Sequence, residues 1–279
     1  MRAMLVSVMI FGSLPVILFL PFFGILVFSW VSYMNPHKLA YWSFIADMPV
    51  AALVAGTTLL AYLFSTEPKR LPPYSVVVVW VLFILWMNVT TAFALTDDLA
   101  MQGWDRTMKI QLMALVTLAF LTVRQRLDLL VWVIVVSIGF YGVKGGLFTL
   151  RTGGQFLLQG PTESFIAGNN EVAFAILLVI PLMRYLQLIE PRAWVRHGLT
   201  VAMGLCTVAV LGSYSRGAFL AAAAIGIFLW LKSPNRLILG IGIAVVATGG
   251  LAFMPQQWFD RMETIQHYQE DGSAMGRIN

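Results

Sequence analysis

Long apolar runs separated by short charged breaks are the dominant pattern of this chain. A helix needs about 20 apolar residues to cross the hydrocarbon of a bilayer. Such runs cover residues 45–64, 74–95, 107–123, 127–148, 168–189, 197–213, 216–231 and 237–254. A first segment, residues 3–34, contains Pro15 and Pro21 and is too long for one straight span. The pattern predicts an all-α, polytopic transmembrane helical bundle with about nine spans.

The two ends of the chain depart from this pattern. We expect segment 3–34 to make one net crossing that is broken near Pro21, whereas two short helices would place the N-terminus on the outer side. Residues 254–268 are too polar to span, yet Trp258, Met262 and Ile265 recur at helical spacing, which predicts an interfacial amphipathic helix. The predicted division is a transmembrane domain over 1–254 and the start of a periplasmic loop over 255–279.

The charged breaks predict the orientation of the spans. An excess of Lys and Arg in short loops marks the cytoplasmic face, and these residues collect at 67–70, 124–126, 190–196 and 232–236. Loops around 97–106 and 151–168, together with the C-terminal tail, fall on the other side. We therefore expect a bacterial inner-membrane protein, surrounded by membrane lipids, with a cytoplasmic N-terminus and a periplasmic C-terminal tail.

Composition excludes a soluble fold and several classes of site. Hydrophobic residues make up 59% of the 279 residues, charged residues make up 11%, and the mean hydropathy is +0.82; soluble domains carry about 25% charged residues. The single Cys206 excludes an intramolecular disulfide and, with no metal-like histidine spacing, a structural zinc site. His37, His197 and His267 lie in an outer loop, a cytoplasmic loop and the tail. Nucleotide-binding and GxSxG motifs are absent, so we expect no cofactor, no metal and no nucleic-acid partner.

The strongest candidate for chemistry is Gly212-Ser-Tyr-Ser-Arg216, where two apolar spans meet almost without a loop. Ser215 is placed to cap the helix that begins near Gly217. Arg216 then lies in its first turn, where free N–H groups favour an anion, and its guanidinium matches phosphate oxygens. The alternative is an interfacial Arg that extends toward lipid headgroups.

Two further polar groups precede this motif. In Gly142-Val-Lys144-Gly-Gly146 the glycines have the small-xxx-small spacing of packed helices, and Lys144 needs an anionic partner, either Glu171 or a bound phosphate. In the second group, Asn169 and Asn170 either cap the helix that starts there or line a site for sugar hydroxyls or an acceptor. Because Glu163 and Glu171 are separated by a predicted loop, they are not assigned as a catalytic pair.

An ordered set of motifs resembles the O-antigen ligase superfamily, specifically the O-glycosylation ligases associated with exosortase A systems. These motifs are Met34-Asn-Pro-His-Lys-Leu39, Gly142-Val-Lys-Gly-Gly146, Gly160-Pro-Thr-Glu-Ser-Phe165 with Asn169-Asn170-Glu171, Ser213-Tyr-Ser-Arg-Gly-Ala218, Met254-Pro-x-x-Trp258 through Arg261-Met262, Thr264-Ile265, and Gly276-Arg-Ile-Asn279.

The resemblance implies a metal-independent, GT-C-like membrane glycosyltransferase that uses lipid carriers. Such enzymes transfer a glycan from a polyprenyl pyrophosphate donor to an acceptor, which is a lipid-linked core sugar or, in the exosortase group, a protein hydroxyl. Arg216 matches the family arginine that holds the pyrophosphate, and Arg277 matches a second one. Together with Lys144, Ser215, Asn169, Asn170 and Glu171, they are the predicted substrate-binding residues.

One family feature lies outside this sequence. Family members carry a histidine, thought to be the base for the acceptor hydroxyl, in a periplasmic loop beyond the position of Asn279, so the catalytic residue is not assigned and the chain resembles a truncated form. We expect the 279-residue form alone to be inactive or severely impaired. The alternatives are a polysaccharide polymerase of the same superfamily, a transporter or flippase for an anionic lipid-linked substrate, and a structural scaffold.

Overall fold

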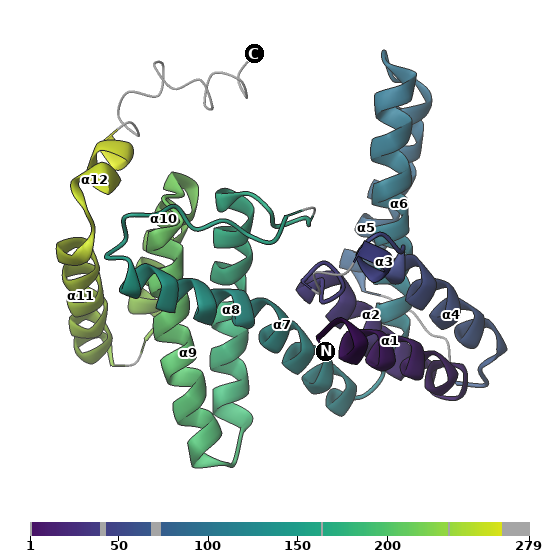
Figure 1. The fold of residues 1–279 in the computed structure, drawn as a ribbon, viewed down its shortest axis with the longest axis horizontal. Helices are drawn as coiled ribbons and strands as arrows, with labels where there is room; N and C mark the ends of the chain where they lie inside the picture. Colours follow the sequence, from purple (N-terminus) through teal and green to yellow (C-terminus); the bar gives the residue numbers. More distant parts are fainter. Residues whose placement is uncertain (1, 40–42, 68–73, 163, 234, 264–279) are drawn as a thin grey trace. The chain divides into compact units, whose positions relative to one another are not determined.

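The computed structural model describes residues 2–39, 43–67, 74–162, 164–233 and 235–263, and these residues form helices and no strand. The helices divide into two compact units (Figure 1). Unit 1 comprises Met1–Ser32 and Ala40–Leu130, and unit 2 comprises Tyr33–Leu39 and Val131–Asn279. The boundary between Leu130 and Val131 falls inside one long helix.

Unit 1 contains the N-terminal helices. They are α1 (Arg2–Phe19), α2 (Pro21–Met34), α3 (Ser43–Ala46), α4 (Val50–Phe64), α5 (Ser75–Ala92), α6 (Asp97–Phe120) and the start of α7 (Arg124–Arg151). The core between α1 and α4 is built from buried aliphatic side chains such as Ile10, Ile17, Val50 and Val54. The predicted break near Pro21 is confirmed, because α1 ends before Leu20 and Pro21, which has no N–H to donate, opens α2.

Helix α6 corrects one prediction. Residues 97–106 were expected to form an outer loop, but they are the first ten residues of α6. The segment is polar and contains no proline, and a carboxylate such as that of Asp98 is favourable at a helix N-terminus. A polar helical segment therefore gives the same signal in the sequence as a polar loop.

Unit 2 contains most of α7 and the helices α8 (Asn169–Ile189), α9 (Ala193–Gly212), α10 (Arg216–Lys232), α11 (Arg236–Phe253) and α12 (Gln256–Glu263). Helices α8 and α9 form an antiparallel hairpin that packs against α10 (Figure 1). The core joins α7, α8 and α9 through residues such as Val135, Ile176, Met183 and Cys206. The predicted packing role of the α7 glycines is confirmed, because a Cβ at Gly146 would overlap the Leu205 carbonyl.

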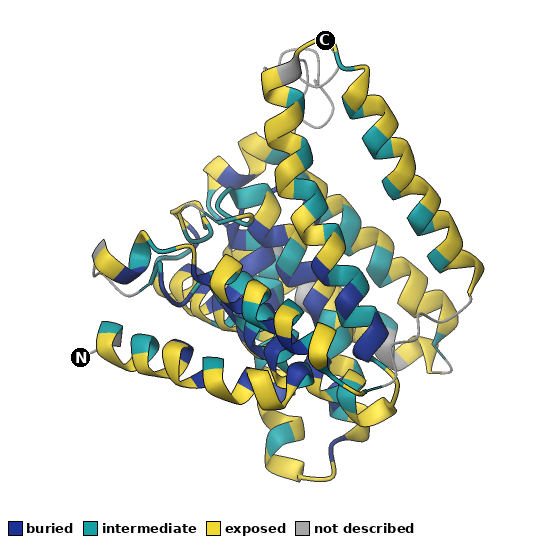
Figure 2. Cartoon of the chain, turned by 90° about the vertical axis from the view of Figure 1, so that its right-hand side faces the viewer, coloured by how far each residue is buried: buried dark blue, intermediate teal, exposed yellow. Residues whose placement is uncertain are grey.

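The helices of the described residues support a helical membrane protein. Four of them, α5, α7, α8 and α9, are long and apolar enough to cross a membrane, and three shorter apolar helices cover Ala3–Phe19, Pro21–Met34 and Val50–Phe64. Figure 2 shows exposed residues along much of the helix surfaces, and on α5 these are apolar side chains such as Val76, Leu82 and Trp86. Such apolar exposure suits contact with lipid. The count of nine spans stays a prediction.

Candidate functional site

The turn between α9 and α10, residues 213–215, is the most constrained polar segment of unit 2. Its three residues, Ser213, Tyr214 and Ser215, are all buried. Tyr214 has a φ of 55°, in the left-handed region that side chains other than glycine seldom adopt. Its hydroxyl donates a 2.6 Å hydrogen bond to the carbonyl of Gly154, 60 residues away in sequence. A conformation of this kind persists only where surrounding contacts hold it.

Ser215 caps α10 as predicted. Its hydroxyl oxygen accepts a hydrogen bond of 3.2 Å from the Ala218 backbone N–H, and its hydroxyl donates one of 2.8 Å to Asn170 Oδ1. Arg216 is thereby fixed as the first residue of α10. The cap satisfies the N–H of Ala218 at the N-terminal end of α10, which is the end where a helix attracts anions.

The two asparagines bind this turn and do not cap their own helix. The N-cap of α8 is Gly168, and it makes no side-chain cap bond. Asn169 Nδ2 donates a 2.9 Å bond to the Ser213 carbonyl, while Asn170 receives the Ser215 hydroxyl. The capping alternative is therefore wrong, because polar groups of a turn 44 residues away compete for the amides.

The segment after α7 also lies against the turn. The Leu158 N–H donates a 2.9 Å bond to the Gly212 carbonyl. Gly154 has a φ of 71°, and a Cβ there would lie 3.2 Å from the Met254 sulfur, so the backbone passes close to the start of the C-terminal segment. Glycine is suited to this position because it adopts positive φ without strain.

Helix α12 brings residues to the turn that the sequence did not single out as site residues. Trp258 is 2% exposed, and its indole Nε1 donates a 3.0 Å bond to the Leu211 carbonyl. Its ring packs edge-on against Phe219 and in a cluster with Tyr214 and Met254.

A second cation lies near the turn. Burial raises the pKa of Tyr214, and the positive charge of Arg261 opposes that rise. Because this opposition is electrostatic, Arg261 on α12 lies close enough to influence the turn. The predicted placement of α12 at the membrane interface stays a prediction.

The charged candidates are not all gathered at the turn. Arg216 lies at the turn, partly buried. Glu171 is exposed in the first turn of α8, and its carboxylate lies so close to Gly168 that a Cβ there would overlap it. The carboxylate therefore sits at the N-terminus of its own helix, where the dipole favours it. Among the residues that the structure describes, no ion pair joins it to Lys144.

Lys144 lies on another face of α7. Thr149 packs against Gly212 at the end of α9, and a helix turns about 100° per residue, so Lys144 points about 140° away from that contact. Its side chain is exposed. Lys144 is therefore separated from the turn.

The structure thus brings only part of the predicted set together. It unites Ser215, Arg216, Asn169 and Asn170, and it places Glu171 beside them. Arg277 and Glu163 lie outside the described residues. Within the described part of the chain, no cluster of His, Cys, Asp or Glu suits a metal.

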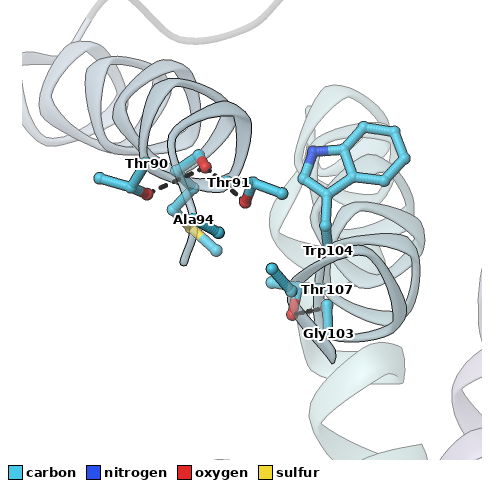
Figure 3. Close-up of a pocket in the computed structure, with 8 residues that line it drawn as sticks. Thr90, Thr91, Ala94, Gly103, Trp104 and Thr107 are labelled. Atoms are coloured by element: carbon cyan, nitrogen blue, oxygen red, sulfur yellow. Dashed lines mark hydrogen bonds between the residues drawn. The ribbon is translucent and has the colours of Figure 1, made fainter. Parts of the chain in front are cut away.

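Unit 1 contains an open cavity of about 250 Å³ between α5 and α6 (Figure 3). Thr90, Thr91 and Thr107 line it together with the ring of Trp104, whose Nε1 donates to Asn88 Oδ1 at 2.9 Å. Each threonine hydroxyl donates to a carbonyl of its own helix. No titratable side chain is among the lining residues, so the cavity has no charge to hold a phosphate.

The turn has the properties of an anion site. It combines a helix N-terminus, the guanidinium of Arg216 at that terminus and the nearby charge of Arg261. Three hydrogen bonds join residues 213–215 to α8 and to Gly154, and two more join Leu211 and Gly212 at the end of α9 to Trp258 and Leu158, so packing fixes the position of Arg216. A planar guanidinium can donate two parallel hydrogen bonds to a phosphate group.

Comparison with known proteins gives two matches, which divide the chain between residues 190 and 201. Residues 1–190 match a family of unknown function (DUF5935), and residues 201–279 match the O-Antigen ligase family. The second match contains the turn, Arg216 and α12, and it supports a place in the O-antigen ligase superfamily. The bond that Asn169 donates to Ser213 and the bond that Asn170 accepts from Ser215 therefore join the two matched regions. No curated protein and no solved structure matches the chain.

Proposed function

The chain belongs to the family of unknown function (DUF5935) that matches residues 1–190, and from this premise we propose that it is an O-antigen ligase-like membrane glycosyltransferase. It transfers a glycan from a polyprenyl pyrophosphate donor to an acceptor hydroxyl at the periplasmic face of the inner membrane. The O-Antigen ligase match over residues 201–279 supports this class of enzyme. The acceptor is a lipid-linked glycan or a protein, as in the exosortase-associated group.

The observation that carries the proposal is Arg216 at the first position of α10. It lies next to a buried turn that hydrogen bonds connect to distant segments. A cation at this helix end is unfavourable for the helix alone, since the N-terminus is already positive. An anion bound beside the guanidinium and the N-terminus of α10 removes that conflict. Pyrophosphate is such an anion, and a polyprenyl chain attached to it would remain in the lipid beside the helices.

Arg216 acts where charge develops during transfer. The acceptor oxygen forms a bond to the anomeric carbon of the glycan, and the bond from that carbon to the pyrophosphate oxygen breaks. The electron pair leaves with the pyrophosphate, whose negative charge grows in the transition state. Hydrogen bonds from Arg216 strengthen as that charge grows and so lower the barrier. The proton of the acceptor hydroxyl passes to a base that is not assigned.

The test replaces Arg216 in the full-length protein. We expect Arg216→Ala to lower transfer about 100-fold or more, by analogy with the loss of one transition-state donor. Arg216→Lys should also be poor, because an ammonium cannot form the bidentate contact. Transfer is measured with a labelled polyprenyl pyrophosphate-linked glycan extracted from host membranes, and attachment to the acceptor is followed by gel mobility.

The matched control is Arg236→Ala. Arg236 is likewise the first residue of a helix, α11, and it is exposed, so its removal should leave transfer within about twofold of the parent. Normal transfer by a well-inserted Arg216→Ala protein would refute the pyrophosphate role. Transfer onto a second lipid-linked glycan, and to no other acceptor, would identify a polymerase in place of a ligase.

A further inference from the structure

Trp258 is the third residue of α12, and its side chain is buried against the turn between α9 and α10. Its backbone N–H donates a 2.9 Å bond to the carbonyl of Pro255, which precedes the helix. Met254, the residue before that proline, is also buried, and it lies close to the backbone of Gly154. The start of α12 is therefore held at the segment that follows α7.

The indole N–H of Trp258 binds the end of α9. The last carbonyl groups of a helix have no partner within the helix itself. The Leu211 carbonyl accepts two bonds, one of 3.2 Å from the Tyr214 backbone N–H and one of 3.0 Å from Trp258 Nε1. Trp258 therefore shares an acceptor with one of the backbone bonds that form the turn.

The ring of Trp258 contacts the start of α10. It packs edge-on against Phe219, with centroids 5.5 Å apart and ring planes at 82°. The Phe219 N–H donates a 2.9 Å bond to the Ser215 carbonyl, which closes the first turn of α10 around Arg216. Residues three apart are neighbours on a helix surface, so Phe219 lies beside Arg216 on α10. Trp258 thus contacts the helices on both sides of the turn.

Tryptophan is suited to this position because it combines a large, rigid apolar ring with a single N–H donor. A phenylalanine at position 258 would keep an aromatic ring for the contact with Phe219 and lose the bond to the Leu211 carbonyl. A leucine would lose both. The two contacts can therefore be removed in steps.

We propose that Trp258 is a positioning residue for the glycan donor. It holds the end of α9 and the first turn of α10 together, and it thereby sets the position from which Arg216 binds the pyrophosphate. A bidentate contact requires the guanidinium and the phosphate oxygens to be aligned, and a displacement of about 1 Å can cost about 100-fold in rate. Trp258 acts through the turn and does not touch the donor. The inference rests on the proposed transferase function.

The test measures donor dependence in the full-length protein with the labelled polyprenyl pyrophosphate-linked glycan. We expect Trp258→Phe to raise the half-saturating donor concentration about fivefold, because one hydrogen bond is lost, and Trp258→Leu to raise it about tenfold or more. The half-saturating amount of acceptor should stay the same. Trp194→Phe is the matched control, because Trp194 of α9 is 73% exposed, and its donor dependence should stay within about twofold of the parent.

A purely structural role of Trp258 gives a different result. A variant that only destabilises the fold lowers the melting temperature and, through the loss of folded protein, the maximal rate. The remaining folded molecules would still bind the donor normally. An unchanged half-saturating donor concentration in Trp258→Phe would therefore overturn the positioning role.

A second measurement asks whether Trp258 acts through Arg216. Effects of coupled residues are not additive, so Trp258→Phe should change donor dependence by about twofold or less when Arg216→Lys is already present. The same fivefold effect in both backgrounds would overturn the action through Arg216.

The outcomes distinguish this inference from the proposed function. Loss of transfer in Arg216→Ala, with unchanged donor dependence in Trp258→Phe, would overturn the positioning role alone. Unchanged transfer in Arg216→Ala would overturn the proposed function and the positioning role with it.

Discussion

At the scale of single residues, the α9–α10 turn depends on hydrogen bonds that reach far along the chain. Tyr214 has positive φ and is held by its bond to Gly154, while Ser215 both caps α10 and binds Asn170. The position of Arg216 follows from these contacts. A residue that never touches a substrate can therefore affect binding at the turn by setting its backbone.

Tyr214→Phe tests this dependence. The variant removes the hydroxyl that binds the Gly154 carbonyl and leaves a buried acceptor without its partner, so the free energy of unfolding should fall by about 1–3 kcal/mol. Thermal unfolding in detergent measures the change. Tyr74→Phe, at a tyrosine that is 68% exposed, should have no effect, and an equal melting temperature for both variants would show that the bond is not needed.

At the scale of helices, glycines decide how closely α7 approaches α9. Gly142 faces the Cys206 side chain, and Gly146 faces the Leu205 backbone. A side chain can move away from an added methyl group, but a helix backbone cannot do so without shifting the helix. The end of α7 also packs against Gly212, so this contact helps to place the turn.

Gly146→Ala should separate the two helices. We expect a loss of about 1–3 kcal/mol from overpacking, which exceeds the gain of about 1 kcal/mol in helix propensity. Gly204→Ala is the matched control, because a Cβ there meets nothing within 4 Å, so this change should be neutral or stabilising. The measurement is the melting temperature of each variant. Equal melting temperatures would contradict the role of Gly146 in packing α7 against α9.

At the scale of the whole molecule, the orientation in the membrane follows from charge. The Lys and Arg residues of the short breaks predict that the α10–α11 connection is cytoplasmic and that the segment after α7 is periplasmic. The same prediction puts the turn and Arg216 on the periplasmic side, where the proposed transfer occurs. The orientation is a prediction from sequence.

Cysteine labelling tests this orientation. In intact inner membranes, an impermeant maleimide applied from the periplasmic side should label Gln155→Cys and should leave Asn235→Cys unlabelled until the membrane is disrupted. Both positions are exposed. The parent protein provides the control, because Cys206 is buried. The reverse labelling pattern would refute the predicted orientation.

The sequence by itself determined several of the helices and their local ends. The apolar runs predicted α8, α10 and α11 to within two residues, and the Ser215 cap was predictable because its partner is only three residues away. The start of α6 was missed, because a polar helical segment has the same composition as a polar loop. These features depend on interactions within one or two helical turns.

Only the tertiary structure decided which polar groups meet. It directed Asn169 and Asn170 to the turn, buried Trp258 against Leu211, placed Lys144 on another face and enclosed His37 with an unsatisfied nitrogen. Each of these outcomes depends on groups more than 40 residues apart or on the face that a helix turns toward its neighbours. The residue type determines what a side chain can bind, whereas packing determines which partner lies within hydrogen-bonding distance.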